Sequence, residues 1–443
     1  MSQSGSTWSR HALALTVAAA LLSAMTMGSR TSLGLFVGPI NSATGFGVAS
    51  VSFALALSFL FWGAAQPVLG LVAARYGAAR VLAGGALLTA LGSVLVALSH
   101  DILSLTASMT LVGIAVAAAG SPPLLLGLVA HGVAPSQRGV ALGIVGAGGS
   151  IGQLLLAPVT ALAITSFGWT GAMLALGLLA LAALPLARVF RSSDGAAMRA
   201  PQSLDDSRAE SRAESRAESR AELLAALRSR DYWLVTAGFF VCGFHVTFLT
   251  THMPGVVELC GFSPTFAGVW LAIVGACNIA GSIGSGWLMQ RVSMKSILTT
   301  LYALRALGVA LFLLAPKTEF VLLAFALWMG LSYMATLPPT AGLIATMFGT
   351  RHIGVLLGVT MAVHQVGGFL GAWFGGLERQ WTGGYTYSWL LDLALALAAA
   401  LVYIPIRERM KAGQEPAPAP TPTRPISRRP SAPTPSVPAP AAR

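Results

Sequence analysis

Arg30 carries the charge that is hardest to place in this sequence. It lies about twenty residues into an apolar run that begins near residue 11. A basic side chain so deep in a membrane segment costs about 2.5–3.5 kcal/mol on insertion scales, so it needs a partner or a function. The residues around it, from Gly28 to Gly34, are mostly small or polar, as the wall of a cavity would be. We predict that Arg30 binds an anionic group. The alternative is that it lies nearer the outer face and reaches the lipid headgroups.

Histidine and glutamine side chains in later apolar runs are further candidates for binding a polar ligand. His245 lies 215 residues after Arg30, and we expect the two side chains to occupy equivalent positions in the two halves and to face a common central cavity. His252 follows His245 by seven residues, two helical turns on and near the same face. A lone histidine inside a helix is more often a hydrogen-bonded structural group, so both interpretations of these two residues stay open. The remaining polar candidates within spans are Gln153, His364 and Gln365.

Arg305 and Asp392 are opposite charges that lie within apolar runs of the second half of the chain. Each would neutralise the other in a medium of low dielectric constant, where a charge without a partner is costly. We expect them to form a buried ion pair with a structural role. A part in a proton relay is the alternative.

The composition excludes a soluble globule. Of the 443 residues, 55% are hydrophobic and only 9% are charged, which is too apolar for a water-compatible surface. The apolar runs are mostly 20 to 28 residues long, and this length fits helices that cross a hydrocarbon layer of about 30 Å. Shorter alternating runs, which are typical of transmembrane β-barrels, do not occur in the sequence. The expected fold class is therefore an all-α membrane protein.

We expect twelve transmembrane helices, and the basic residues orient them. The expected spans lie near residues 11–38, 48–74, 81–99, 102–131, 139–164, 170–190, 232–256, 265–289, 296–315, 318–346, 353–377 and 385–406. With a cytoplasmic N-terminus, most of the 27 Lys and Arg fall in cytoplasmic segments. This bias follows the positive-inside rule and accounts for the net charge of +12 without a nucleic-acid partner. Both termini are therefore expected in the cytoplasm, and the protein in the cell (inner) membrane.

The chain contains two homologous halves in the same order. Gly45-Phe46 returns as Gly261-Phe262, and Pro122-Pro123 returns as Pro338-Pro339, each after 216 residues. Landmarks in one order at one offset indicate two pseudo-symmetric six-helix bundles. A turn rich in glycine and arginine is repeated as well, and we expect it to act in gating. Its residues are Gly70, Arg75 and Gly77 in the first half, and Gly286 and Arg291 in the second.

Twelve spans in two halves, with this turn after the second and the eighth span, resemble the major facilitator superfamily. The resemblance covers residues 11 to about 410. The family usually carries an aspartate before the arginine of the turn, and these positions are Ala74 and Gln290 here. The resemblance implies a transporter in which two bundles surround a central site.

Two segments, residues 30–46 and 138–150, resemble the monocarboxylate and oxalate porter branch of that superfamily. In the branch, the basic residue of the first span contacts the substrate carboxylate, and the match falls on Arg30. The branch also tends to place Asp or Asn in the eighth span, with an arginine four residues later. Asn278 matches this pattern, whereas the later position is Ser282.

Four segments of the chain are expected to differ in structure. They are an N-terminal six-helix bundle (1–190), a charged cytoplasmic linker with Ser-Arg-Ala-Glu repeats (191–230), a C-terminal six-helix bundle (231–410) and a tail rich in Pro and Ala (411–443). The linker is expected to be a solvated spacer. The tail lacks the apolar side chains needed to fold, so we expect disorder there.

The resemblance and Arg30 together imply a secondary transporter that moves a small organic anion of the carboxylate type by alternating access. Proton symport or anion exchange would drive it. The alternative is proton-driven efflux of a drug or another small neutral or cationic compound. A membrane enzyme or a sensor is disfavoured, because the sequence has no hydrolase elbow, Walker loop or HExxH motif. We expect no cofactor and no metal ion. The expected partners are the substrate, the lipid bilayer and, in symport, protons.

Overall fold

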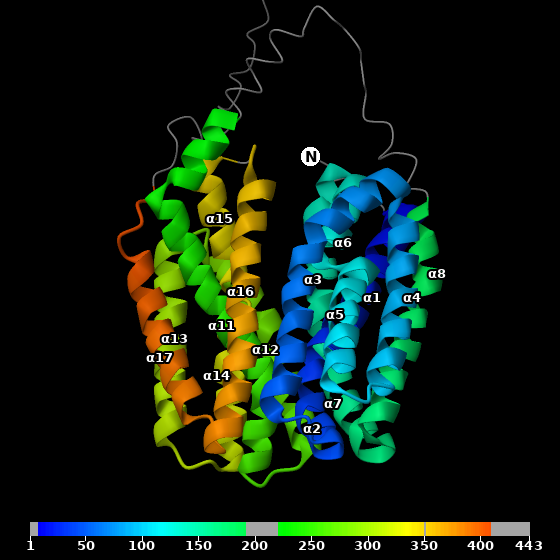
Figure 1. Cartoon of the computed structure of the whole chain (residues 1–443). Coiled ribbons are helices and arrows are strands. Elements are labelled where there is room, and N and C mark those ends of the chain that lie inside the picture. The colour runs from blue at the N-terminus through cyan, green and yellow to red at the C-terminus, as the bar shows by residue number, and fades with distance from the viewer. Residues whose placement is uncertain (1–7, 192–219, 350, 409–443) are drawn as a thin grey trace, which may run out of the picture.

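The structure, a computed structural model, describes residues 8–191, 220–349 and 351–408. All regular elements in these residues are helices, and they form two bundles that stand side by side (Figure 1). We call the end at which Arg191 and Arg230 lie the linker end, and the opposite end the loop end. Most of the expected Ser-Arg-Ala-Glu linker and the whole of the expected 411–443 tail lie outside the described residues.

The first bundle contains residues 10–190. Its elements are α1 (Arg10–Ser32), η1 (Leu33–Phe36), α2 (Val37–Thr44), α3 (Val48–Tyr76), α4 (Ala78–Ala97), α5 (Ile102–Gly120), α6 (Pro122–Gly132), α7 (Pro135–Leu181), α8 (Ala183–Ala187) and η2 (Arg188–Phe190).

The second bundle contains residues 230–403. Its elements are α11 (Arg230–Leu259), α12 (Pro264–Leu288), α13 (Met294–Leu314), α14 (Glu319–Ser332), α15 (Leu337–Phe348), α16 (Ile353–Thr382) and α17 (Thr386–Tyr403).

The number of membrane spans agrees with the sequence prediction. Eleven helical segments of the described residues are long and apolar enough to cross a membrane. One of them, Pro135–Phe190, has 56 residues, whereas a single span needs about 20. The chain turns within it at Gly168, whose φ of 71° and ψ of 170° are not helical. This segment therefore supplies two spans, and the prediction of twelve is confirmed.

The duplicated landmarks have the same conformation in both halves. Gly45 ends α2 with φ 69°, and Gly261 follows α11 with φ 82°. Glycine adopts this left-handed region without the steric cost that a Cβ would bring. Pro122 and Pro338 each stand in the first turn of a helix that continues a broken span. The repeated residues therefore mark the same turns and the same breaks in the two bundles.

The two bundles contact each other mainly through α3 with α16 and through α7 with α12. These contacts lie toward the loop end. The backbone N–H of Ala49 donates to Oε1 of Gln380 at 3.0 Å, and Gly268 packs against α7 at Ala157 and Ala161. Close packing without large side chains between them joins the bundles at this end.

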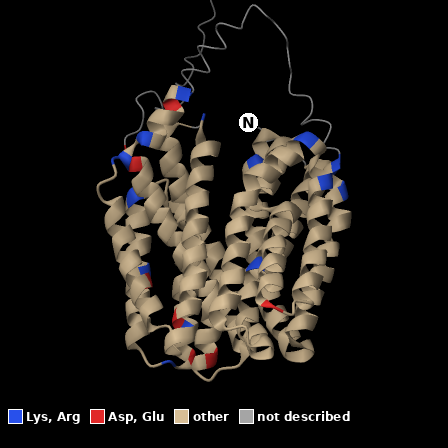
Figure 2. Ribbon diagram, viewed as in Figure 1, with Lys and Arg blue, Asp and Glu red and all other residues tan. Residues whose placement is uncertain are grey.

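Toward the linker end, the same four helices diverge (Figure 1). Their glycines there continue the contacting faces, and a Cβ added to any of them would meet no atom within 4 Å. These open glycines are Gly70, Gly139, Gly143, Gly146, Gly286, Gly354 and Gly358. Figure 2 shows that the basic residues also gather at the linker end, while the middle of the bundles carries few charges.

The packing of α11 on α16 gives a first testable expectation. Gly243 lies directly against the backbone carbonyl of His364. Gly243→Ala would press a methyl group on that carbonyl, and overpacking of this kind costs about 1–3 kcal/mol. We expect a lower melting temperature of the detergent-solubilised protein. Gly358→Ala is the matched control, because its Cβ would meet nothing within 4 Å. Equal melting temperatures of the two variants would contradict this packing.

Candidate functional site

Arg30 is held at the junction of the two bundles by aromatic rings. It lies in the last turn of α1. Its guanidinium carbon is 4.6 Å from the ring centre of Phe59 and 4.3 Å from that of Trp62, both on α3. Stacking on ring faces stabilises a guanidinium while its N–H donors, which point outward in the plane, stay available. The first bundle therefore presents a fixed cation.

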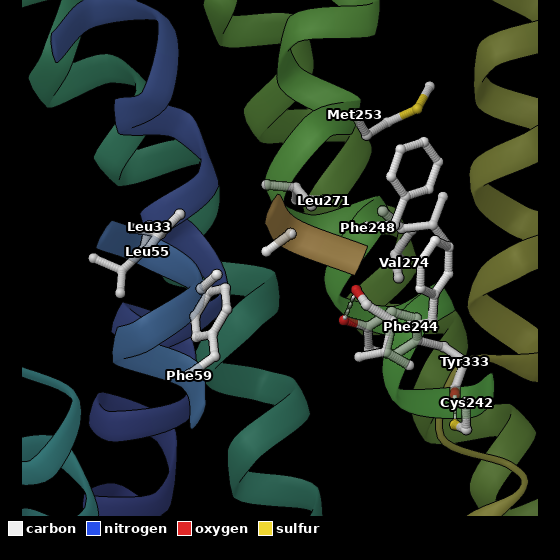
Figure 3. Packing of buried hydrophobic residues seen from close by; sticks show 14 of the residues in the cluster. Leu33, Leu55, Phe59, Cys242, Phe244, Phe248, Met253, Leu271, Val274 and Tyr333 are labelled. Atoms are coloured by element: carbon white, nitrogen blue, oxygen red, sulfur yellow. Dashed lines mark hydrogen bonds between the residues drawn. The ribbon is translucent and has the colours of Figure 1, made fainter. Parts of the chain in front are cut away.

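The second bundle contributes polar groups to the same place. Tyr333 interacts electrostatically with Arg30, and its hydroxyl donates to the carbonyl of Val246 at 3.3 Å. Gln365 of α16 packs against Gly63, the neighbour of Trp62 in α3. Figure 3 shows Phe59 on one side of the junction and Tyr333 on the other. We call Arg30, Phe59, Trp62, Tyr333 and Gln365 the central site.

No carboxylate of the described residues neutralises the charge of the central site. The ion pairs formed by the described residues do not include Arg30. Nε of Arg30 and Nε1 of Trp62 are buried donors without a hydrogen-bond partner, and Oε1 of Gln365 also lacks one. Buried polar groups are normally satisfied, so a set of free ones points to a ligand or to water. The arrangement can attract an anion and donate hydrogen bonds to it.

Gln153 and Asn278 join the two bundles. Nε2 of Gln153 donates to the carbonyl of Leu271 on α12 at 3.2 Å. Nδ2 of Asn278 donates to Oγ of Ser150 on α7 at 2.9 Å, and its Oδ1 accepts from the N–H of Met334 at 3.0 Å. Their amide groups are thus occupied by protein partners, and the two residues belong to the contact between α7 and α12.

His245 does not face the central site. It is 1% exposed, and its Nε2 lies 3.2 Å from Oδ1 and 3.0 Å from the backbone carbonyl oxygen of Asp392 on α17. The expectation that His245 and Arg30 face a common cavity is therefore wrong. The offset of 216 that relates the repeated landmarks matches Arg30 with Val246. A shift of one residue turns a side chain by about 100° around the helix, which moves His245 into its own bundle.

The other two histidines are packed inside the second bundle. Nε2 of His252 lies 2.6 Å from the carbonyl oxygen of Ala372, and its ring packs beside Phe248. The ring of His364 lies 4.6 Å from that of Phe239. His252 thus has the geometry of a hydrogen-bonded structural histidine, the alternative that the sequence left open.

The expected direct ion pair between Arg305 and Asp392 is not formed. Arg305 donates instead to the backbone carbonyls of Ser332 and Tyr333, the latter at 2.7 Å. These carbonyls lie at the end of α14, where the helix breaks before α15 begins at Leu337, so the N–H groups of a following helical turn do not bind them. The carbonyls at this break need other donors, and Arg305 supplies them. It remains an electrostatic neighbour of Asp392.

The repeated turns lie at the linker end of each bundle. The guanidinium carbon of Arg75 is 5.4 Å from the ring centre of Tyr76, and that of Arg291 is 4.1 Å from the ring centre of Trp287. Gly77, with φ 96°, separates α3 from α4. Each arginine thus rests on an aromatic ring of its own turn, where the family usually has an aspartate nearby.

Three residues of the central site were not singled out from the sequence. Phe59, Trp62 and Tyr333 are aromatic, and aromatic residues are frequent in apolar spans. The fold is needed to tell which of them point to the junction. The sequence did contain a signal for Tyr333, which precedes the paired prolines by five residues. Helix breaks at membrane depth are tolerated where protein or water surrounds them, so residues near such a break often lie close to a cavity.

Comparison with known proteins yields one family. Residues 19–372 match the sequence profile described as the Major Facilitator Superfamily. Monocarboxylate transporter 11 of Homo sapiens is 28% identical over 397 residues, which cover 85% of this chain and 79% of that protein. Monocarboxylate transporter 13 of Rattus norvegicus is 26% identical over 373 residues, with 83% and 82% covered. The uncharacterized MFS-type transporter YcxA of Bacillus subtilis is 30% identical over 256 residues. That alignment covers 56% of this chain and 60% of the relative, which is less than two thirds of its length.

Solved structures agree on the fold. The D-xylose-proton symporter superposes with a TM-score of 0.71 at 16% identity, covering 90% of this chain and 99% of that one. A bacterial homologue of the human lysosomal transporter Spinster gives a TM-score of 0.70 at 14% identity, covering 90% and 97%. At such identities the likeness concerns the fold alone.

The role of Arg305 at the helix break can be tested by stability. Arg305→Met strands the carbonyls of Ser332 and Tyr333, and each stranded acceptor costs about 1–3 kcal/mol. We expect a lower melting temperature of the solubilised protein. The double variant Arg305→Met/Asp392→Asn should be as unstable, because Arg305 serves the carbonyls. If the double variant regained the wild-type melting temperature, the two charges would form a direct pair after all.

Proposed function

The chain belongs to the Major Facilitator Superfamily and is a secondary transporter, and we propose that its substrate is a small organic anion with a carboxylate group. The observation that carries this proposal is Arg30, a cation at the junction of the bundles that forms no ion pair with a carboxylate in the described part of the chain. Relatives named monocarboxylate transporters support the same class of substrate. The proposed transporter needs no cofactor and no metal ion.

The central site fits a carboxylate attached to a compact organic body. A guanidinium and a carboxylate form two parallel hydrogen bonds, which fixes the orientation of the anion. Phe59 and Trp62 hold the plane of Arg30, so little side-chain entropy is lost when the anion binds. The same rings offer apolar surface to the remainder of the substrate, while Nε1 of Trp62 and Oε1 of Gln365 are without hydrogen-bond partners among the described residues and can bind a second polar group.

The arrangement of the bundles supports alternating access. Contacts at the loop end close one side, and the divergence at the linker end opens the other. The linker end faces the cytoplasm in this proposal, and the basic residues gathered there support that orientation by the positive-inside rule. This conformation is then the inward-open one, with both termini in the cytoplasm of the cell (inner) membrane. In the opposite conformation, the open glycines allow the same helices to approach closely.

The charge of the substrate requires compensation. Moving one charge across the membrane potential costs about 2.3 kcal/mol per 100 mV, so a lone anion cannot accumulate in a cell that is negative inside. A proton that travels with a monoanion removes this cost, and exchange for an internal anion does the same. We propose proton symport or anion exchange as the driving force.

Uptake of labelled acetate, lactate, pyruvate, benzoate and oxalate by expressing cells, with and without a proton gradient, tests the substrate class. Arg30→Gln keeps hydrogen bonding but loses the charge. A charge-assisted hydrogen bond contributes about 1.5–3 kcal/mol, so uptake should fall by about tenfold or more. Arg10→Gln, at the exposed start of the same helix, is the matched control and should transport normally. Normal uptake by Arg30→Gln at equal membrane abundance would remove the basis of the proposal.

Cysteine pairs can follow the two conformations in a variant whose Cys242, Cys260 and Cys277 are replaced by serine. The pair Ala49→Cys/Gln380→Cys spans the loop-end contact, and Gly70→Cys/Gly358→Cys spans the diverging linker end. Because transport needs both conformations, we expect each pair to form a disulfide with an oxidant in membranes, and either disulfide to stop uptake reversibly. A linker-end pair that never reacts during transport would argue against alternation.

A further inference from the structure

A second group of charged and titratable side chains lies inside the second bundle, and the central site does not use it. His245 of α11, Arg305 of α13 and Asp392 of α17 are 1%, 1% and 0% exposed. They come from three different helices, and they lie at the depth of the hydrocarbon layer. Such residues are rare in membrane segments, and they mark ion or proton pathways more often than they serve packing.

Asp392 has the surroundings of a neutral carboxylic acid. Both of its carboxylate oxygens are buried without a hydrogen-bond donor. Nε2 of His245 lies near Oδ1 at 3.2 Å, but it lies as close to the backbone carbonyl at 3.0 Å. Arg305, the nearby cation, gives its hydrogen bonds to Ser332 and Tyr333. An ionised carboxylate without donors in this medium is strongly disfavoured, so the observed geometry suits Asp392 with a proton bound.

Several of the helices packed around this group contribute titratable or charged side chains. The set consists of Cys242 and His245 from α11, Tyr302 and Arg305 from α13, Tyr333 from the break between α14 and α15, His364 from α16, and Asp392 and Tyr403 from α17. Of these side chains, Asp392 is the carboxylic acid, and its two oxygens have no hydrogen-bond donor among the described residues.

Tyr333 connects this group with the central site. Its backbone carbonyl accepts a hydrogen bond from Arg305 at 2.7 Å, and its side chain interacts electrostatically with Arg30. The two arginines therefore act on the same residue, one on its backbone and one on its ring. Arg305 is therefore in direct contact with a residue that forms part of the central site.

We propose that Asp392 is the proton-binding site that couples proton movement to anion transport, and that Arg305 transmits its state to Tyr333. The inference rests on the proposed anion transport. A proton from water forms an O–H bond with the carboxylate, and Arg305 then keeps the carbonyls of the helix break, as observed. When that O–H bond breaks and the proton leaves to water at the linker end, the carboxylate attracts Arg305, which withdraws from Ser332 and Tyr333. His245 is a positioning residue for the carboxylate. When one proton moves with each monoanion, no net charge crosses the membrane.

The first test uses the full chain in proteoliposomes. The substrate is the labelled acid of the panel that the wild type takes up fastest. Two activities are compared: uptake driven by a pH gradient, and counterflow at equal pH on both sides of the membrane. Counterflow exchanges anion for anion and needs no net proton transfer. Asp392→Asn should keep counterflow within about twofold of the wild type, and its uptake driven by the pH gradient should fall to that of protein-free liposomes. Glu319→Gln, an exposed acid in the first turn of α14, should keep both activities.

The second test needs no substrate. A buried carboxylic acid has a C=O stretching band in the infrared that disappears when the proton leaves. The difference spectrum of the wild type between acidic and alkaline pH should contain this band, Asp392→Asn should lack it, and Glu319→Gln should keep it. A persisting band or persisting gradient-driven uptake in Asp392→Asn would overturn the proton site, as would wild-type uptake indifferent to the pH gradient. If no panel acid is transported, the proposed substrate class fails while the infrared test still decides the proton site.

Discussion

Backbone carbonyls at the two proline breaks need hydrogen-bond donors, because the hydrocarbon layer supplies none. In the first bundle, the hydroxyl of Thr26 donates to the carbonyl of Gly120 at 3.0 Å. The residue at the repeated position, 216 later, is Cys242. Its thiol is a weak donor and lies 4.0 Å from the carbonyl of Tyr333. At the break of the second bundle, Arg305 donates to the carbonyls of Ser332 and Tyr333, and a permanent charge is buried there.

This substitution makes the two halves unlike in charge. The first bundle holds Arg30 at the junction, stacked on rings and in no ion pair that the described residues form. The second bundle holds Arg305 among its own helices, together with Asp392 and His245. Arg305 gives the hydrogen bonds of Nε and Nη2 to Ser332 and Tyr333, and its interaction with Asp392 is electrostatic, without a hydrogen bond. Because the carbonyls at the helix break take these hydrogen bonds, the carboxylate of Asp392 receives none from Arg305 and can bind a proton.

The fold followed from the sequence because its signals are local and strong. Apolar runs of membrane length fixed the spans, and glycines with positive φ fixed turns such as Gly45, Gly168 and Gly261. The site was harder to predict because it depends on orientation around helices. The landmarks at an offset of 216 match Arg30 with Val246, and His245, one residue away, points elsewhere. The predicted ion pair of Arg305 and Asp392 was wrong for another reason. The sequence prediction considered only the two opposite charges and not the backbone carbonyls at the helix break. The function of Arg30 stays a prediction.

The open glycines of the linker end affect how much free energy a change of conformation requires. Residues such as Gly70, Gly146 and Gly358 have no side chain to order when the helices meet. Burying a long side chain costs up to about 2 kcal/mol of rotamer entropy, and this loss does not arise at a glycine surface. The closed and open forms can then differ little in free energy. A modest difference in the affinity of the two forms for one small ligand is enough to shift such a balance. The protein would in that case use only a small part of the ion gradient to change its shape, and the greater part would remain available to concentrate its cargo.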